Sequence, residues 1–127
     1  MSYYFSKKLD LGFDEAIEKV TEALKGEGFG ILTEIDVKET LKKKLDVDFR
    51  PYIILGACNP PFAHKALEAE DKIGTMLPCN VIVEKLDDGV EVAAVDPVAS
   101  MKAVENDQLG DIAFTIQNKL KSVIEGL

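Results

Sequence analysis

The hydrophobic and polar positions divide the N-terminal part of the chain into alternating strand-like and helix-like segments. Residues 3–9 and 29–35 carry mostly apolar side chains at alternate positions, which is the period of a strand with one buried face. Residues 13–25 repeat apolar side chains at helical spacing, with Ile17, Val20 and Leu24 on one face. The pattern therefore predicts a strand, an amphipathic helix and a second strand.

A short helix and a more apolar strand follow. Asp36 opens a capping-box pattern, so we expect a helix after it that buries Val37, Leu41 and Leu45. Tyr52–Cys58 (YIILGAC) shows no polar alternation and is apolar throughout. A continuous apolar run of this length predicts a central strand that is covered on both faces.

Helix and strand signals alternate again toward the C-terminus. Asn59 and Pro60 are favoured at the first positions of a helix, which we expect to extend to about residue 71. Residues 80–86 and 90–95 predict two strands joined by a tight turn at Asp87-Asp88-Gly89. Asp96-Pro97 predicts a short helical piece before a final helix. That helix has the clearest core-facing stripe in the chain: Leu109, Ile112, Ala113, Ile116, Leu120, Val123, Ile124 and Leu127.

The predicted order of elements is β-α-β-α-β-α-β-β-α. This order favours an α+β fold of two layers, in which one mostly antiparallel sheet of about five strands carries helices largely on one face. The length of 127 residues and the absence of a linker or repeat predict a single domain that spans residues 1–127.

The net charge of −8 argues against partners that are themselves negatively charged. Nucleic acids and anionic membranes attract clusters of Lys and Arg, so we expect neither as a partner. No stretch is long and apolar enough for a membrane span, and the N-terminus has no signal-peptide core. We therefore expect a cytoplasmic protein, in which a pair of cysteines is more often free thiols, a metal site or a redox couple than a structural disulfide.

Cys58 is the first candidate functional residue. It ends a predicted strand and directly precedes a predicted helix, so its sulfur should lie near the free N–H groups and the positive dipole end of that helix. Both features favour a thiolate, which makes Cys58 a candidate nucleophile or ligand. The alternative is a small buried side chain that closes the strand.

Cys79 and His64 complete the candidate site. Cys79 begins a strand, and neighbouring antiparallel strands would bring it to Cys58, while His64 lies about one turn into the intervening helix. Together Cys58, Cys79 and His64 would supply three ligands for zinc or a soft site for copper, and the same three residues are the catalytic candidates. Each cysteine precedes an asparagine, and we assign Asn59 and Asn80 to binding the same ligand.

Three functions remain open at this point. The leading one is a small binding domain that holds a soft metal ion or a thiol-reactive small ligand at the Cys58/Cys79/His64 corner. The second is a thiol redox protein or enzyme, with Cys58 as nucleophile and Cys79 as the resolving thiol. The third is a homo-oligomeric interaction module, in which an open sheet face associates with a second copy and both cysteines only pack.

Several segments resemble the family known as domain of unknown function 302. They are residues 29–36 (FGILTEID), residues 55–60 (LGACNP), Ala63-His64, and Gly74 with residues 77–80 (LPCN), followed by the hairpin and Asp96-Pro97. The resemblance covers nearly the whole chain. It implies a compact α+β domain with a curved sheet like that of the TATA-binding protein, and it implies self-association. Similar sequences usually carry Leu where Met76 stands, which favours packing for Met76. The family has no established activity, so the resemblance assigns no catalytic residue.

Overall fold

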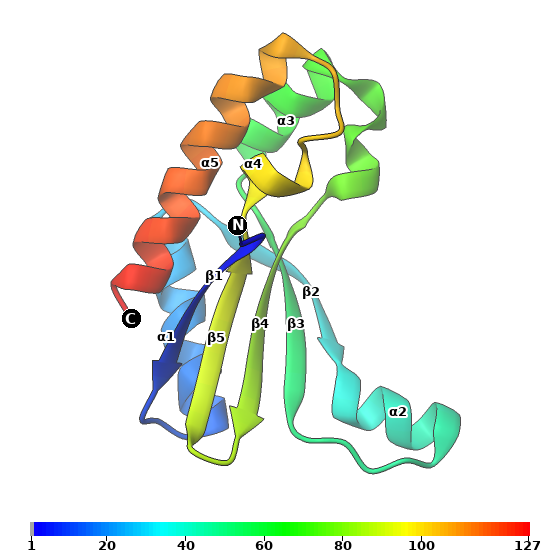
Figure 1. Cartoon of the computed structure of the whole chain (residues 1–127), viewed down its shortest axis with the longest axis vertical. Coiled ribbons are helices and arrows are strands. Elements are labelled where there is room, and N and C mark those ends of the chain that lie inside the picture. The colour runs from blue at the N-terminus through cyan, green and yellow to red at the C-terminus, as the bar shows by residue number, and fades with distance from the viewer. Residues whose placement is uncertain (1) are drawn as a thin grey trace.

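Five strands form one antiparallel sheet. The computed structural model describes residues 2–127. Its strands are β1 (Tyr4–Leu9), β2 (Gly30–Asp36), β3 (Tyr52–Cys58), β4 (Cys79–Leu86) and β5 (Gly89–Val95). Their lateral order is β1-β5-β4-β3-β2, and every neighbouring pair is antiparallel (Figure 1). The predicted α+β class with a single sheet of five strands is confirmed.

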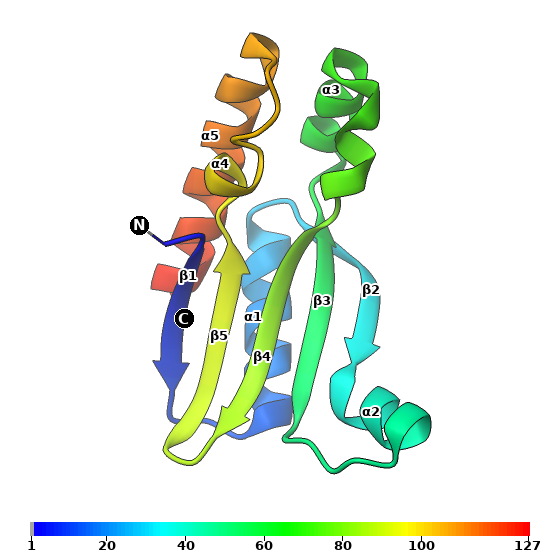
Figure 2. The same cartoon turned by 45° about the vertical axis from the view of Figure 1, so that its right-hand side comes forward.

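Helices cover one face of this sheet and extend past one end of it. The helices are α1 (Phe13–Gly26), α2 (Val37–Leu45), α3 (Pro60–Ala69), the 3-10 helix η1 (Asp71–Met76), α4 (Pro97–Ser100) and α5 (Asp107–Glu125). Figure 2 shows α1 behind the sheet, while α3, η1 and the first half of α5 stand above the strand ends. Part of the helical layer therefore has no strand beneath it.

The buried residues form two clusters as a consequence. The larger cluster lies between the sheet and α1 and α5, and includes Val20, Leu24, Leu55 and Leu120. The smaller cluster lies among the helices above the strand ends, around Ala66, Ile73 and Leu109. A cavity lies between the two clusters.

The helix caps follow the local sequence closely. The Oδ1 atom of Asp36 accepts a hydrogen bond from the N–H of Glu39 at 2.9 Å, as the capping pattern predicts. Asp96 caps α4 and Asn106 caps α5 in the same manner. The turn between β4 and β5 uses Gly89 at φ +141°, a backbone conformation that other residues rarely adopt.

Two expectations about burial are wrong. Helix α2 has no buried residue, and Leu45 is 66% exposed, because the helix lies beyond edge strand β2, where no other element covers it (Figure 2). Strand β3 is an inner strand, but helices cover only one of its faces. Its other face places the half-buried Ile54 opposite Ile35 and Ile82 on an open surface.

Candidate functional site

A cavity of about 340 Å³ separates the two hydrophobic clusters. Its wall includes the ends of β3 and β4, side chains from α3 and α5, and the residue that follows α4; among them are Phe62, Leu67, Met101, Ile112 and Ile116. Among the described residues of the wall, Asn59 carries the only amide and no side chain carries a charge. The volume lies at the lower end of the range for ligand pockets, roughly 300–1,000 Å³.

Cys58 and Cys79 both line this cavity. The strand register explains why, since Cys79 pairs with Ala57, the residue before Cys58. Cys58 is half-buried, Cys79 is buried, and both are free thiols. The tertiary structure therefore brings the two candidate cysteines to the same apolar cavity.

The two thiols differ in chemical character. Burial, and then the neighbouring Cys58, raise the pKa of Cys79 from its ordinary value of 9.0 to about 11. Cys79 is therefore protonated at neutral pH, and a protonated thiol is a poor nucleophile. Of the pair, Cys58 is the more exposed to solvent.

The start of α3 does not offer the anion site expected from the sequence. Pro60 and Pro61 occupy its first two positions and supply no N–H, while the N–H of Ala63 donates to the carbonyl of Asn59. Two of the donors that would stabilise a thiolate at Cys58 are therefore missing. The side chain of Asn59 makes no capping bond either; its Nδ2 donates to the carbonyl of Glu27 at 3.2 Å.

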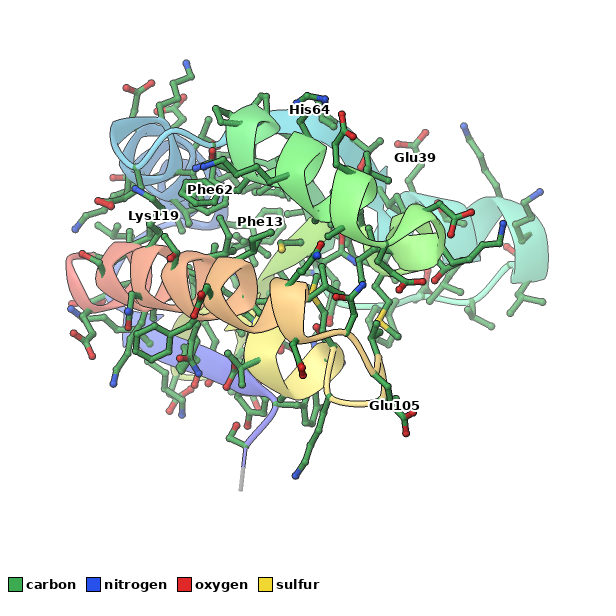
Figure 3. All side chains as sticks on the ribbon, turned by 90° about the horizontal axis from the view of Figure 1, so that it is seen from above. Phe13, Glu39, Phe62, His64, Glu105 and Lys119 are labelled. Carbon is green, nitrogen blue, oxygen red and sulfur yellow. The ribbon has the colours of Figure 1, made fainter. Side chains whose placement is uncertain are left out.

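His64 lies away from the two cysteines. Its side chain is 75% exposed and its Nε2 lies 3.0 Å from Oε1 of Glu68, one turn along the same helix. Figure 3 shows His64 on the outer side of α3, directed away from α5. Among residues 2–127 no group of three or more His, Cys, Asp or Glu side chains is arranged to hold a metal ion.

The remaining candidates divide between the two faces of the sheet. Asn59 lines the cavity, but Asn80 lies on the open face, opposite Gly56, where it lines the same shallow pocket as Tyr4 and Tyr52. Met76 packs on the smaller cluster, as a core residue does. The aromatic and aliphatic wall of the cavity was not predicted, because its residues come from seven elements and the loops between them and share no local pattern.

Known proteins resemble this chain over nearly its whole length. A family model described as domain of unknown function DUF302 matches residues 5–127. The chain belongs to the DUF302 family. The resemblance stated from the sequence is thus confirmed, and it extends over the cavity and both cysteines.

The DUF302 fold is also found in a solved structure. It is the crystal structure of an uncharacterized conserved DUF302 protein from Bacillus stearothermophilus, with 29% sequence identity and a TM-score of 0.91 over 98% of each chain. No curated protein matches the chain. In the part of the DUF302 domain that the structure describes, no helix is long and apolar enough to cross a membrane.

Proposed function

We propose that this DUF302 domain binds a small, largely apolar molecule in the cavity between the two hydrophobic clusters, with the thiol of Cys58 beside the ligand. The observation that carries the proposal is the cavity itself, whose wall is apolar apart from Asn59 and the two thiols. An apolar cavity offers water few hydrogen-bond partners. An apolar ligand that displaces this water therefore breaks few hydrogen bonds. Each methylene group that enters contributes about 0.8 kcal/mol.

The two thiols on the cavity wall indicate which chemical group the ligand carries. Cys58 is half-buried on the wall, so a ligand with a soft or electrophilic group meets a sulfur there. A metal ion fits less well, because His64 faces solvent and the two cysteines alone are two of the four ligands that zinc usually takes. The cavity therefore suits a small ligand that contacts the thiol better than it suits a metal ion.

A neutral fluorescent probe tests the proposal. Phenylnaphthylamine is apolar and uncharged, and we expect its emission to rise on saturable binding to the protein. Ala63→Leu places a larger side chain on the cavity wall and should weaken binding. Ala69→Leu is the matched control, since Ala69 is half-buried on the same helix but does not line the cavity. Equal binding by both variants, or no saturable binding by the parent protein, would overturn the proposal.

The thiol part has its own test. A bulky maleimide should attach to Cys58 before Cys79 and then block the probe, while Cys58→Ser should bind the probe and resist the maleimide. If modified Cys58 leaves probe binding unchanged, the thiol is not beside the ligand and that part of the proposal is wrong.

A second candidate function, self-association, rests on the open face of the sheet. Three rows of side chains cross this face. The middle row runs Ile35, Ile54, Ile82, Ala93 and Ser6, and the row below it includes Tyr52, Glu84, Glu91 and Lys8. The row above includes Gly56 and Asn80, with Tyr4 near them. The centre of the face is therefore mainly apolar, with charged side chains on one side and amide and hydroxyl groups on the other.

This arrangement is complementary to itself, and we infer that a second copy of the chain covers it. A two-fold axis along the middle row lays Ile54 and Ile82 on the same residues of the second copy. It also places Asn80, whose amide group donates, opposite the carboxylate of Glu84, which Arg50 of the same chain also contacts. Apolar groups at the centre with polar groups at the rim are usual in dimer interfaces.

Solution mass decides this second candidate. We expect sedimentation equilibrium to give twice the chain mass of 13.9 kDa. Ile82→Glu should give the single-chain mass, whereas Phe114→Glu, which changes an exposed apolar residue on α5, should not. A single-chain mass for the parent protein at every concentration would contradict the inference.

A further inference from the structure

The side of the cavity at Phe62 has a feature that the apolar wall does not explain. Phe62 is half-buried and lines the cavity, and two ammonium groups lie over its ring. The Nζ atom of Lys65 lies 5.2 Å from the ring centroid, and that of Lys119 lies 6.0 Å from it. Lys65 belongs to α3 and Lys119 to α5, so the two helices that flank the cavity each contribute one cation.

Figure 3 shows Phe62 and Lys119 facing each other across the space between α3 and α5. The Lys119 side chain is 31% exposed, and its Nζ is 4.0 Å from Oε1 of Glu27, a long separation for an ion pair. Within residues 2–127, Lys65 has no carboxylate at ion-pair distance. The cations are therefore weakly neutralised, in a chain whose net charge is −8.

We propose that the ligand of this cavity is an anionic amphiphile, with its apolar tail inside and its acidic head group between Lys65 and Lys119. This inference rests on the proposed function, because it specifies the ligand of the same cavity. The tail lies along Phe62 and against the aliphatic wall. The head group stays at the rim, since the interior holds no cation and Asn59 already donates to a carbonyl.

The alternative explanation is that the lysines serve only Phe62, through the attraction of a cation to an aromatic face. That attraction needs one ammonium group over the ring, and a second one adds repulsion between like charges. An acidic group near both ammonium groups offsets this repulsion. The arrangement thus matches a bound acid better than an empty rim.

Three probes with the same tail test the inference. We expect decanoate to bind more tightly than decanol, and decanol more tightly than decyltrimethylammonium. Replacing both cations, in Lys65→Met with Lys119→Met, should weaken decanoate about tenfold, which is a few-fold for each partly exposed charge contact. The same change should leave decanol binding as it was. Added salt should weaken decanoate alone, because salt screens exposed charges.

Lys121→Met is the matched control, because Lys121 is exposed on α5 and does not contact Phe62. It should leave all three affinities unchanged. Equal binding of decanoate and decanol would overturn the anionic head group while the proposed function stands. Binding of none of the three probes would overturn both. A loss of decanol binding in the double variant would show that the lysines only support the cavity wall, and would also overturn the inference.

Discussion

Ala57 and Cys79 occupy directly opposite positions on β3 and β4. This pairing places Cys79 beside Cys58, although the two cysteines are separated by a helix, a 3-10 helix and a turn along the chain. The pair is asymmetric, because Cys79 is buried and Cys58 is half-buried. The asymmetry makes the two thiols distinguishable by experiment.

The stability of the protein should fall at alkaline pH because of Cys79. In the unfolded chain the thiol ionises near its ordinary pKa of 9.0, while burial in the fold raises that pKa to about 11. Between these values the folded state binds more protons, so the free energy of unfolding decreases as pH rises. We expect a loss of roughly 1–3 kcal/mol between pH 9 and 11 that is absent in Cys79→Ala. Urea unfolding of the parent protein and Cys79→Ala across this pH range measures the difference. If the free energy of unfolding fell equally with pH in both proteins, Cys79 would not be the cause.

Gly56 should not tolerate a side chain. A Cβ atom at this position would lie 2.7 Å from Cγ of Pro78 and would also overlap Oγ1 of Thr33. We expect Gly56→Ala to lower the free energy of unfolding by roughly 1–3 kcal/mol, the usual cost of overpacking. Gly30→Ala is the control on the neighbouring strand, since no heavy atom lies within 4 Å of its added Cβ. Denaturant unfolding compares the two, and an equal effect would show that crowding is not the cause.

Leu120 and Leu45 should differ in their contribution to stability, although helical periodicity predicts that both are buried. Leu120 on α5 is fully buried, whereas Leu45 on α2 is 66% exposed. We expect Leu120→Ala to cost roughly 2–5 kcal/mol and Leu45→Ala less than about 0.5 kcal/mol. Thermal unfolding of the two variants and the parent protein, at the same protein concentration, measures both costs. A large cost at Leu45 would mean that α2 is covered in solution, in agreement with self-association.

Asp96 should be the more important of two helix caps. Its Oδ1 accepts from the N–H groups of Val98 and Ala99, and its carboxylate also accepts from Nε2 of Gln117 on α5 at 3.1 and 3.2 Å. Removing it in Asp96→Ala should cost roughly 1–3 kcal/mol. Asp36→Ala removes only the cap of α2, which buries no residue, and should cost less than about 1 kcal/mol.

Hydrogen exchange separates the two caps further. Without Asp36, faster exchange should stay confined to the amides of α2, since that helix frays without exposing the core. Without Asp96, exchange should also rise in α5. The opposite pattern would show that α2 is part of the cooperative core.

The elements of this fold were predictable because their signals are local. The cap at Asp36 involves an N–H group three residues away, and the hairpin at Gly89 needs only its own backbone angle. The burial of α2 was not predictable from its apolar positions, because periodicity reports which face is apolar and not whether another element covers it. His64 shows the same limit, since helical spacing placed it near Cys58 but could not show that the side chain turns outward toward Glu68.

By itself, the sequence determined the order of strands and helices, their caps and turns, the α+β class and the family, since each depends on residues close together in the chain. The tertiary structure alone decided that Cys58 and Cys79 share an apolar cavity, that His64 is absent from it, and that Lys65 and Lys119 both lie near the ring of Phe62. The physical reason is that the strand register and the gap between the two clusters are set by packing among distant segments, which no local pattern encodes.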